Sequence, residues 1–320
     1  MINKHSLALA VLALVAAGTA SAQSSVTLYG RLNVTAEREK IGSAKAIVEL
    51  ENNSSRLGLK GEEDLGGGMK AGFILEHGFD PTTGKAASNF WGRQSEAYLS
   101  SNFGTLRLGN FGSEAQLATG DWVSMHNHDT GTSADRLYAY FGSDVNKVAY
   151  RAPTLVKNLV LEGSASEATA TAKRTYDLAA NYELGALKLG AGYNKQGDAK
   201  QFAVRAAYEM GAFTVGTYVQ RDTNAIAAGS RTNVRLAGMY TMGASEFHAN
   251  VGAAGKVGGA AGTAAKQFTL GYNYNLSKRT KVYTYYTKLD NGANSNYGAD
   301  LGLKTGEDFS SLAVGVRHNF

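Results

Sequence analysis

Ionisable side chains of both signs recur in this chain at positions where they could line a charged passage. The basic members lie on separate short segments: Arg31, Lys60, Arg107, Arg205 and Arg235. The acidic members lie in one long polar stretch, residues 111–145: Glu114, Asp121, Asp129 and Asp135. Fixed charges that face each other across a narrow aqueous path create a transverse field, which favours polar solutes over apolar ones. This chemistry requires that the segments carrying the basic residues surround a lumen.

The same stretch supports a catalytic or metal-binding function less well than it supports a charged passage. Residues 129–133, Asp-Thr-Gly-Thr-Ser, have the wording of an aspartic-protease loop, but that chemistry needs two carboxylates that share a proton, and the sequence holds no second copy. His126 and His128 beside Asp129 make an incomplete metal shell. The Gly66–Gly68 run opens a strand rather than a helix, so it predicts a turn and not a phosphate cradle. We predict no catalytic residue, no metal site and no cofactor.

The segments that hold these charges alternate between apolar and polar residues. Phe202, Val204, Ala206 and Tyr208, for example, precede the turn at 210–212, and three other segments in the second half repeat this pattern. A period of two is that of a β-strand with one apolar face. Such faces are buried either against a second sheet or against lipid.

Composition and the amino terminus favour an exported chain. Lys4, an apolar run over 7–17 and the A-x-A site at 20–22 predict a signal peptide over residues 1–22 and one mature domain over 23–320. The chain has no cysteine, and it has 39 glycines against 2 prolines, which suits many turns between paired strands. Removing Lys4 lowers the formal net charge from +5 to +4, a mild excess that does not indicate a nucleic-acid partner.

Alternation and turn signals predict sixteen strands. Their expected ranges are 25–38, 56–63, 69–79, 92–100, 104–110, 146–152, 158–166, 174–184, 187–196, 200–210, 213–221, 231–242, 245–253, 265–276, 280–289 and 310–320. The connections alternate between short turns and generally longer polar loops, including 39–55 and 111–145. Short turns at one end and long loops at the other are typical of a barrel inserted into a membrane from one side. We therefore predict an all-β protein, a closed sixteen-stranded antiparallel transmembrane barrel.

The aromatic residues fit this barrel. Four tyrosines stand two or three residues before short turns and predict an outward girdle at the membrane interface: Tyr182, Tyr208, Tyr240 and Tyr274. Alternation up to the terminal Phe320 predicts a last strand that ends with the chain, and an assembly signal read by the barrel-insertion machinery. The same alternation places the five basic residues named above in the lumen. Arg31, Lys60, Arg107 and Arg205 are expected near mid-height.

Five short motifs, in order, resemble the general porins of Gram-negative bacteria, of the trimeric type common in Betaproteobacteria. They are Ser25–Gly30, Ser55–Gly68, Phe103–Gly109, Leu276–Thr280 and Gly315–Phe320. The resemblance implies a multi-pass protein of the outer membrane, in contact with its lipid, that assembles as a homotrimer. It also implies a third loop, here 111–145, that folds inward to narrow each pore. The sequence of this loop departs from the usual Pro-Glu-Phe type, so the family's constriction residues cannot be matched to positions here with precision.

Two classes of function remain open at this level. The first is a general diffusion channel for small hydrophilic solutes and ions, with a modest anion preference set by the basic residues. The alternative is a substrate-specific outer-membrane channel or, less favoured, a barrel enzyme. A sugar channel would line its path with aromatic rings. Tyr283, Tyr285 and Tyr286 are candidates for such rings, because the sequence leaves open which of them face the lumen. Small residues on the outward face, Gly30, Gly163 and Gly238, would permit close contact between barrels.

Overall fold

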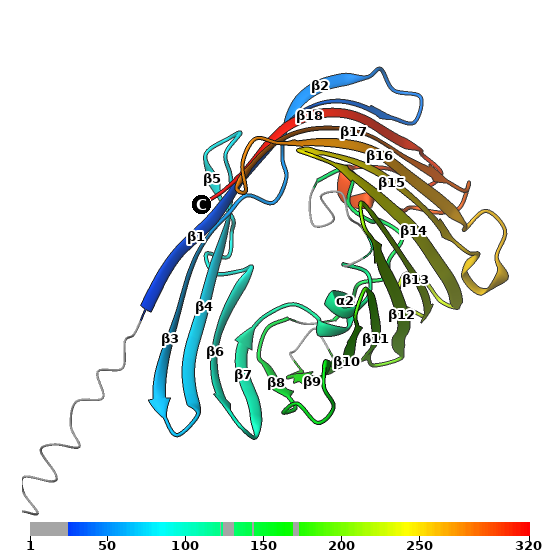
Figure 1. Cartoon of the computed structure of the whole chain (residues 1–320). Helices are drawn as coiled ribbons and strands as arrows, with labels where there is room; N and C mark the ends of the chain where they lie inside the picture. Colours follow the sequence, from blue (N-terminus) through cyan, green and yellow to red (C-terminus); the bar gives the residue numbers. More distant parts are fainter. Residues whose placement is uncertain (1–24, 122, 124–130, 143, 169–172) are drawn as a thin grey trace, which may run out of the picture.

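The computed structural model describes residues 25–121, 123, 131–142, 144–168 and 173–320. These residues form an antiparallel sheet rolled into a ring around a central space (Figure 1). The predicted signal peptide lies outside the described residues. The first strands are β1 (Ser25–Ile41), β2 (Ile47–Asn52), β3 (Arg56–Gly66), β4 (Met69–Asp80), β5 (Lys85–Ala86), β6 (Gln94–Ser101), β7 (Gly104–Asn110), β8 (Lys147–Arg151) and β9 (Leu159–Ser166). The remaining strands are β10 (Thr175–Leu184), β11 (Leu187–Gln196), β12 (Ala199–Met210), β13 (Phe213–Thr223), β14 (Ser230–Met242), β15 (Ser245–Ala254), β16 (Ala265–Asn275), β17 (Thr280–Asn291) and β18 (Phe309–Asn319).

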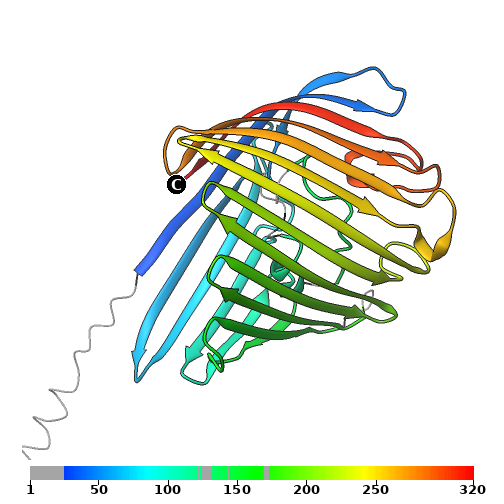
Figure 2. The same ribbon diagram turned by 45° about the vertical axis from the view of Figure 1, so that its right-hand side comes forward.

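The eighteen strand segments of the described chain fill sixteen positions in the ring. β2 and β3 pair one after the other along β1, so together they make one interrupted barrel strand. β5 pairs only with the end of β4 and lies outside the main sheet. Every other strand pairs with the strands that precede and follow it around the ring, and Figure 2 shows β10 to β17 lying side by side in this order. The predicted sixteen-stranded antiparallel barrel is confirmed.

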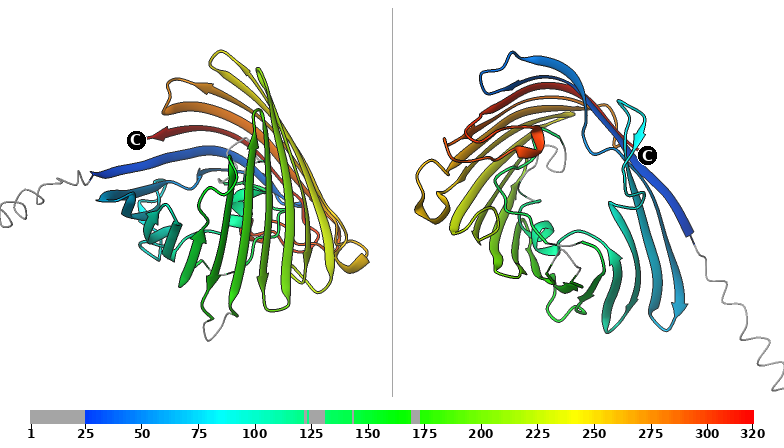
Figure 3. Two further views of the ribbon diagram at one scale, coloured as in Figure 1. Left: turned by 60° about the horizontal axis from the view of Figure 1, so that its bottom comes forward. Right: turned by 180° about the vertical axis from the view of Figure 1, so that it is seen from behind.

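The first and last strands close the ring. β1 pairs with β18 from Arg31 opposite Asn319 to Ile41 opposite Phe309. Both views in Figure 3 place the carboxyl terminus beside β1. Gly30 and Phe320 extend the pairing by exchanging two backbone hydrogen bonds of 3.1 Å. The Phe320 ring occupies the space that a Cβ at Gly30 would need. Gly30 therefore makes room for closure of its own barrel, and it does not offer the open surface between barrels that its size suggests.

One predicted loop is wrong in extent. Residues 39–55 were expected to be loop, whereas β1 continues to Ile41 and β2 returns from Ile47, leaving a short turn between them. This hairpin stands out beyond its neighbours in Figure 2. Beyond the membrane the outward face of a strand meets water, so this face has no reason to be apolar. Glu37, Arg38, Glu39 and Lys40 show the result, because the period-two signal disappears while the strand goes on.

Elsewhere the two faces of the strands differ in chemistry. On β14, Asn233 and Arg235 point inward and are buried, while Val234 and Leu236 point outward and are 42% and 51% exposed. Large apolar side chains exposed in this way on strand after strand form a continuous outer band, which water would not stabilise but lipid does. No helix among the described residues is long and apolar enough to cross a membrane.

The girdle tyrosines lie on the outward-facing positions of their strands. Tyr208 and Tyr274 are 46% and 43% exposed, and Tyr182 shares the parity of the exposed Leu178. Tyr240 stacks between two neighbouring phenylalanines, with ring centroids 4.6 Å from Phe213 and 6.3 Å from Phe247. Aromatic rings next to short turns are suited to the interface, where the ring meets acyl chains and the hydroxyl meets water.

A cationic side chain in the middle of the outer band should destabilise the barrel. We expect Leu236→Arg to lower the free energy of unfolding by about 2–4 kcal/mol, because the guanidinium would face hydrocarbon. Thr214→Arg, which points into the lumen near a turn, should cost less than about 1 kcal/mol, because its guanidinium stays in water. Urea unfolding in lipid vesicles measures both. Equal losses in the two variants would contradict the assignment of the faces.

Candidate functional site

The connection between β7 and β8, which we call loop 3, enters the ring. Its short helix α2 (Glu114–Ala118) lies inside the barrel (Figure 1) and packs against β10 and β11. Gly190 and Gly192 of β11 form the floor beneath it, because a Cβ at either position would collide with the carbonyl oxygen of Ala118 or Ala115. The inward-folded third loop is thereby confirmed.

Hydrogen bonds at its amino-terminal end fix α2 in place. Ser113 is the N-cap, and its hydroxyl accepts a hydrogen bond from the backbone N–H of Gln116. The Asp177 carboxylate on β10 accepts a hydrogen bond from the Ser113 hydroxyl and another, of 2.8 Å, from the N–H of Ala115. A wall carboxylate thus satisfies one N–H group that the first helical turn leaves without a partner, and Ser113 satisfies another.

Arg107 is the second anchor of loop 3. Its guanidinium pairs with Glu96 at 2.9 Å, with Glu162 at 2.7 Å and with Glu114 of α2. Arg107 is 9% exposed, so water screens these ion pairs only weakly. The structure therefore brings Arg107 and Glu114 into direct contact instead of placing them on opposite sides of an open passage.

Arg235 and Asp135 are also brought together. The Arg235 guanidinium lies 2.9 Å from the Asp135 carboxylate, which also accepts a hydrogen bond from the Tyr218 hydroxyl. The same carboxylate accepts a 2.8 Å hydrogen bond from the N–H of Leu137, which shapes the local turn of loop 3. This pair ties the returning half of the loop to β13 and β14.

Two further contacts attach loop 3 to the wall. The Thr132 hydroxyl donates to Glu37 on β1 at 2.6 Å. The Tyr138 hydroxyl lies 2.7 Å from that of Thr119, and Gln201 on β12 donates to it at 3.3 Å. Burial raises the pKa of Tyr138 to about 12, so this hydroxyl keeps its proton at physiological pH.

The other predicted site residues are dispersed. Arg31 is buried in the wall and donates to the Ser54 carbonyl at 3.4 Å. The Lys60 ammonium lies 5.5 Å from the centre of the Tyr29 ring. Arg205 lies beside α2 and donates to Asn181 and to the Leu189 carbonyl, each at 3.0 Å. Asp121 is half-buried just after α2, and Asp129 lies outside the described residues.

A set of basic residues that the sequence interpretation missed surrounds Arg31. Arg56 faces Arg31 across β1 and β3, and Arg317 of β18 lies between Asn33 of β1 and Lys281 of β17. Together with Arg93 they form what we call the basic arc: Arg31, Arg56, Arg93, Lys281 and Arg317. The alternation of apolar and polar residues along a strand predicts that Arg317 and Arg56 face the lumen, because they adjoin the outward-facing Val316 and Leu57.

Two carboxylates interact with the basic arc. Glu76 lies 3.6 Å from Arg56 and 2.7 Å from Arg93, and Glu246 lies 3.7 Å from Lys281. The arc thus places five basic side chains along one wall of the lumen, with Glu76 and Glu246 among them.

The ambiguous tyrosines are resolved by the register of β17. Tyr283 and Tyr285 point inward, are each 2% exposed and stack with centroids 6.2 Å apart, while Tyr286 points outward. Their hydroxyls donate to Asn33 at 2.6 Å and to Glu37 at 2.7 Å. Buried rings with engaged hydroxyls brace the wall and offer no stacking surface to a sugar.

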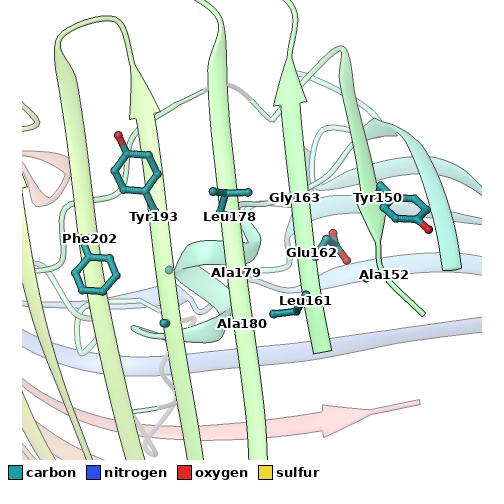
Figure 4. A pocket seen from close by; sticks show the side chains of 12 residues that line it. Tyr150, Ala152, Leu161, Glu162, Gly163, Leu178, Ala179, Ala180, Tyr193 and Phe202 are labelled. Atoms are coloured by element: carbon teal, nitrogen blue, oxygen red, sulfur yellow. The ribbon is translucent and has the colours of Figure 1, made fainter. Parts of the chain in front are cut away.

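A shallow apolar groove lies on the outer face of β8 to β12 (Figure 4). Leu161, Leu178 and Phe202 line it together with alanines and glycines, and the rings of Tyr150 and Tyr193 flank it. Its lining belongs to the outward band, so it meets the membrane and not the lumen. It adds no chemical group to the pore.

A closed barrel with an apolar exterior, a charged interior and a loop anchored inside it defines a transmembrane channel. A sequence model of the family described as Gram-negative porin matches residues 8–294. The chain belongs to this family, and it is a multi-pass protein of the bacterial outer membrane.

Individual relatives span the whole chain. "Outer membrane porin protein 32" of Delftia acidovorans is 30% identical, with 99% of this chain and all of the relative covered. An outer membrane porin protein of Bordetella pertussis is 25% identical with the same coverage. The solved "Anion-selective porin from Comamonas acidovorans" superposes with a TM-score of 0.77 at 27% identity, over 93% of this chain and 100% of that one.

Removing the loop 3 anchor should loosen the constriction. We expect Arg107→Ala to lower the free energy of unfolding by about 3 kcal/mol, because it leaves buried carboxylates without their cation. Single-channel currents should become noisier as α2 leaves its floor. Lys188→Ala is the control, since the exposed pair of Lys188 with Glu209 at 2.6 Å should contribute less than about 1 kcal/mol. An unchanged stability and current in Arg107→Ala would show that the cluster does not hold the loop.

Proposed function

We propose that this porin is a passive general diffusion channel for small hydrophilic solutes and ions, with a modest preference for anions. The observation that carries the anion preference is the basic arc. Four of its five basic side chains sit on β-strands and Arg93 directly precedes β6, so they act on ions that pass along that wall. Fixed charge at a place where water is scarce biases both the entry and the passage of ions.

The loop 3 acids oppose this bias less than their number suggests. Asp135 pairs with Arg235, so its negative charge is compensated within the barrel, whereas Glu114 shares Arg107 with Glu96 and Glu162 and is compensated in part. The basic arc, by contrast, gathers five basic side chains beside the carboxylates of Glu76 and Glu246. The related barrel from Comamonas acidovorans is named as an anion-selective porin, which supports the same direction here.

The family and the fold point to a channel rather than to an enzyme. We further propose that the chain has no catalytic activity, and that the acids and histidines of residues 126–135 serve the constriction or its solvation. A substrate-specific channel is the weaker alternative, because the inward tyrosines of β17 are buried in the wall.

We also propose the assembly route. Residues 1–22 direct export, the barrel-insertion machinery recognises the last strand and Phe320, and three barrels associate in the outer-membrane lipid. The position of Phe320 supports its role, since the residue that would carry the signal also seals the barrel against Gly30.

Charge selectivity is measured by the reversal potential of the purified protein in a planar bilayer under a gradient of dilute KCl. We expect an anion-selective sign. A unit charge roughly 8 Å from a passing ion in water contributes about 0.5 kcal/mol. Each lost charge should therefore disfavour the anion and favour the cation by about twofold each, and reduce the anion-to-cation permeability ratio about sixfold. The double variant Arg31→Gln, Arg317→Gln tests this, and Lys266→Gln, on the outward face of β16, should change nothing.

The sign of the reversal potential tests the anion preference, and the variants test which residues cause it. A cation-selective reversal potential for the unaltered protein would overturn the anion preference. An unchanged potential in the double variant would remove these two residues from the ion path. The complete absence of conductance would reject the pore.

Trimer formation is tested by gel electrophoresis of protein extracted in mild detergent. We expect a slow band that collapses to a single chain on heating, because contacts among three large apolar surfaces persist until the barrels unfold. A monomer that retains full conductance after native extraction would contradict the homotrimer.

A further inference from the structure

An acidic cluster lies on the inner side of the β1–β2 hairpin, at the end of the barrel that carries the longer loops. Glu39 of β1 and Glu49 and Glu51 of β2 each offer a carboxylate oxygen, and these oxygens all lie within 4.8 Å of one another. The register brings them together, because Glu49 and Glu51 lie opposite Glu37 and Thr35, on the same inward face as Glu39. Such proximity of like charges is unfavourable unless a cation or protons neutralise them.

Glu39 provides an independent sign that a ligand is needed. Glu39 is only 8% exposed, and its carboxylate atom Oε1 is buried without a hydrogen-bond partner among the described residues. A buried carboxylate oxygen is costly when neither water nor a donor reaches it. The orphan carboxylate belongs to the same residue that contributes a ligand oxygen to the cluster.

The neighbouring side chains do not compensate this charge. None of the ion pairs among the described residues includes Glu39, Glu49 or Glu51. Glu37, the adjacent acid, is satisfied differently, since the hydroxyls of Thr132, Tyr285 and Ser311 donate to it. Glu37 still lies against Glu39, so its negative charge adds to the crowding of the three acids.

We propose that Glu39, Glu49 and Glu51 bind one calcium ion at the outer mouth of the pore. Calcium takes oxygen ligands at about 2.3–2.6 Å, so oxygens on opposite sides of the ion are up to roughly 5 Å apart. Magnesium holds its ligands at about 2.0–2.1 Å and would require a separation near 4 Å at most, with strict octahedral geometry. Carboxylate oxygens no more than 4.8 Å apart can share a calcium shell without strict octahedral geometry, and water completes the coordination where Glu49 is exposed.

A bound calcium ion has two consequences. It ties β2 to β1 where the hairpin projects beyond the ring, and it adds two positive charges beside the carboxyl groups of Glu37, Glu39, Glu49 and Glu51. The change in charge matters only if the proposed anion preference holds, because the bound ion then reduces the repulsion between the acidic residues and anions that approach the basic arc.

Isothermal titration of the full-length mature porin in detergent, washed with EDTA and kept near pH 7, tests the site. We expect one saturable calcium site per chain, with at least tenfold weaker binding of magnesium. Glu39→Gln and Glu49→Gln should each weaken calcium binding tenfold or more. Glu167→Gln is the matched control, because this exposed acid pairs with Arg174 in the loop after β9, and its removal should leave the affinity unchanged.

Titration and conductance separate this inference from the proposed function. No saturable calcium binding, or equal affinity in Glu39→Gln and the unaltered protein, would overturn the site whatever the selectivity. A cation-selective channel that binds calcium as described would overturn only the anion preference. The heat-sensitive band on a gel shows that each variant is folded. If Glu39→Gln fails to fold, Glu49→Gln, at an exposed position, gives the same test alone.

Discussion

The structure depends on one constraint, which is that backbone N–H and C=O groups inside hydrocarbon must all find partners within the protein. The pairing of β1 with β18 satisfies this for the two strands that would otherwise be edges, and the exchange between Gly30 and Phe320 carries it to the last residue. Once the ring is closed, alternate side chains must face either lipid or lumen. The apolar exterior and the charged interior are both consequences of closure.

Closure also decides how charge can be used. Inward side chains crowd a limited space, so most acids and bases meet a partner there, as Arg107 and Arg235 do with the acids of loop 3. Only the inward charges that are not neutralised by these internal ion pairs act on solutes in the pore. On this view the selectivity of the pore is a property of unevenly matched walls, such as the basic arc and the acidic cluster on the β1–β2 hairpin.

The sequence predicts those parts of the fold on which lipid imposes a pattern. Val234 and Leu236 alternate with polar residues because one face must be apolar, and the same rule locates nearly every strand. The rule extends to β2, where the exposed Val48 and Leu50 alternate with Glu49 and Glu51, but it fails at the end of β1, where Arg38 and Lys40 occupy the outward face. The contacts of loop 3 are also invisible to it. The pairing of Asp135 with Arg235 depends on the path of an irregular loop through the lumen, which no local periodicity encodes.

Loop 3 has a mechanical consequence as well as an electrostatic one. Ser113 is held by Asp177 of β10, Arg136 by Gln267 of β16 and Thr132 by Glu37 of β1. A hollow cylinder under lateral pressure deforms most easily by flattening into an oval, and a strut across the bore opposes that deformation directly. The loop that narrows the bore is therefore also its internal brace, which keeps the cross-section constant as the surrounding lipid compresses or relaxes.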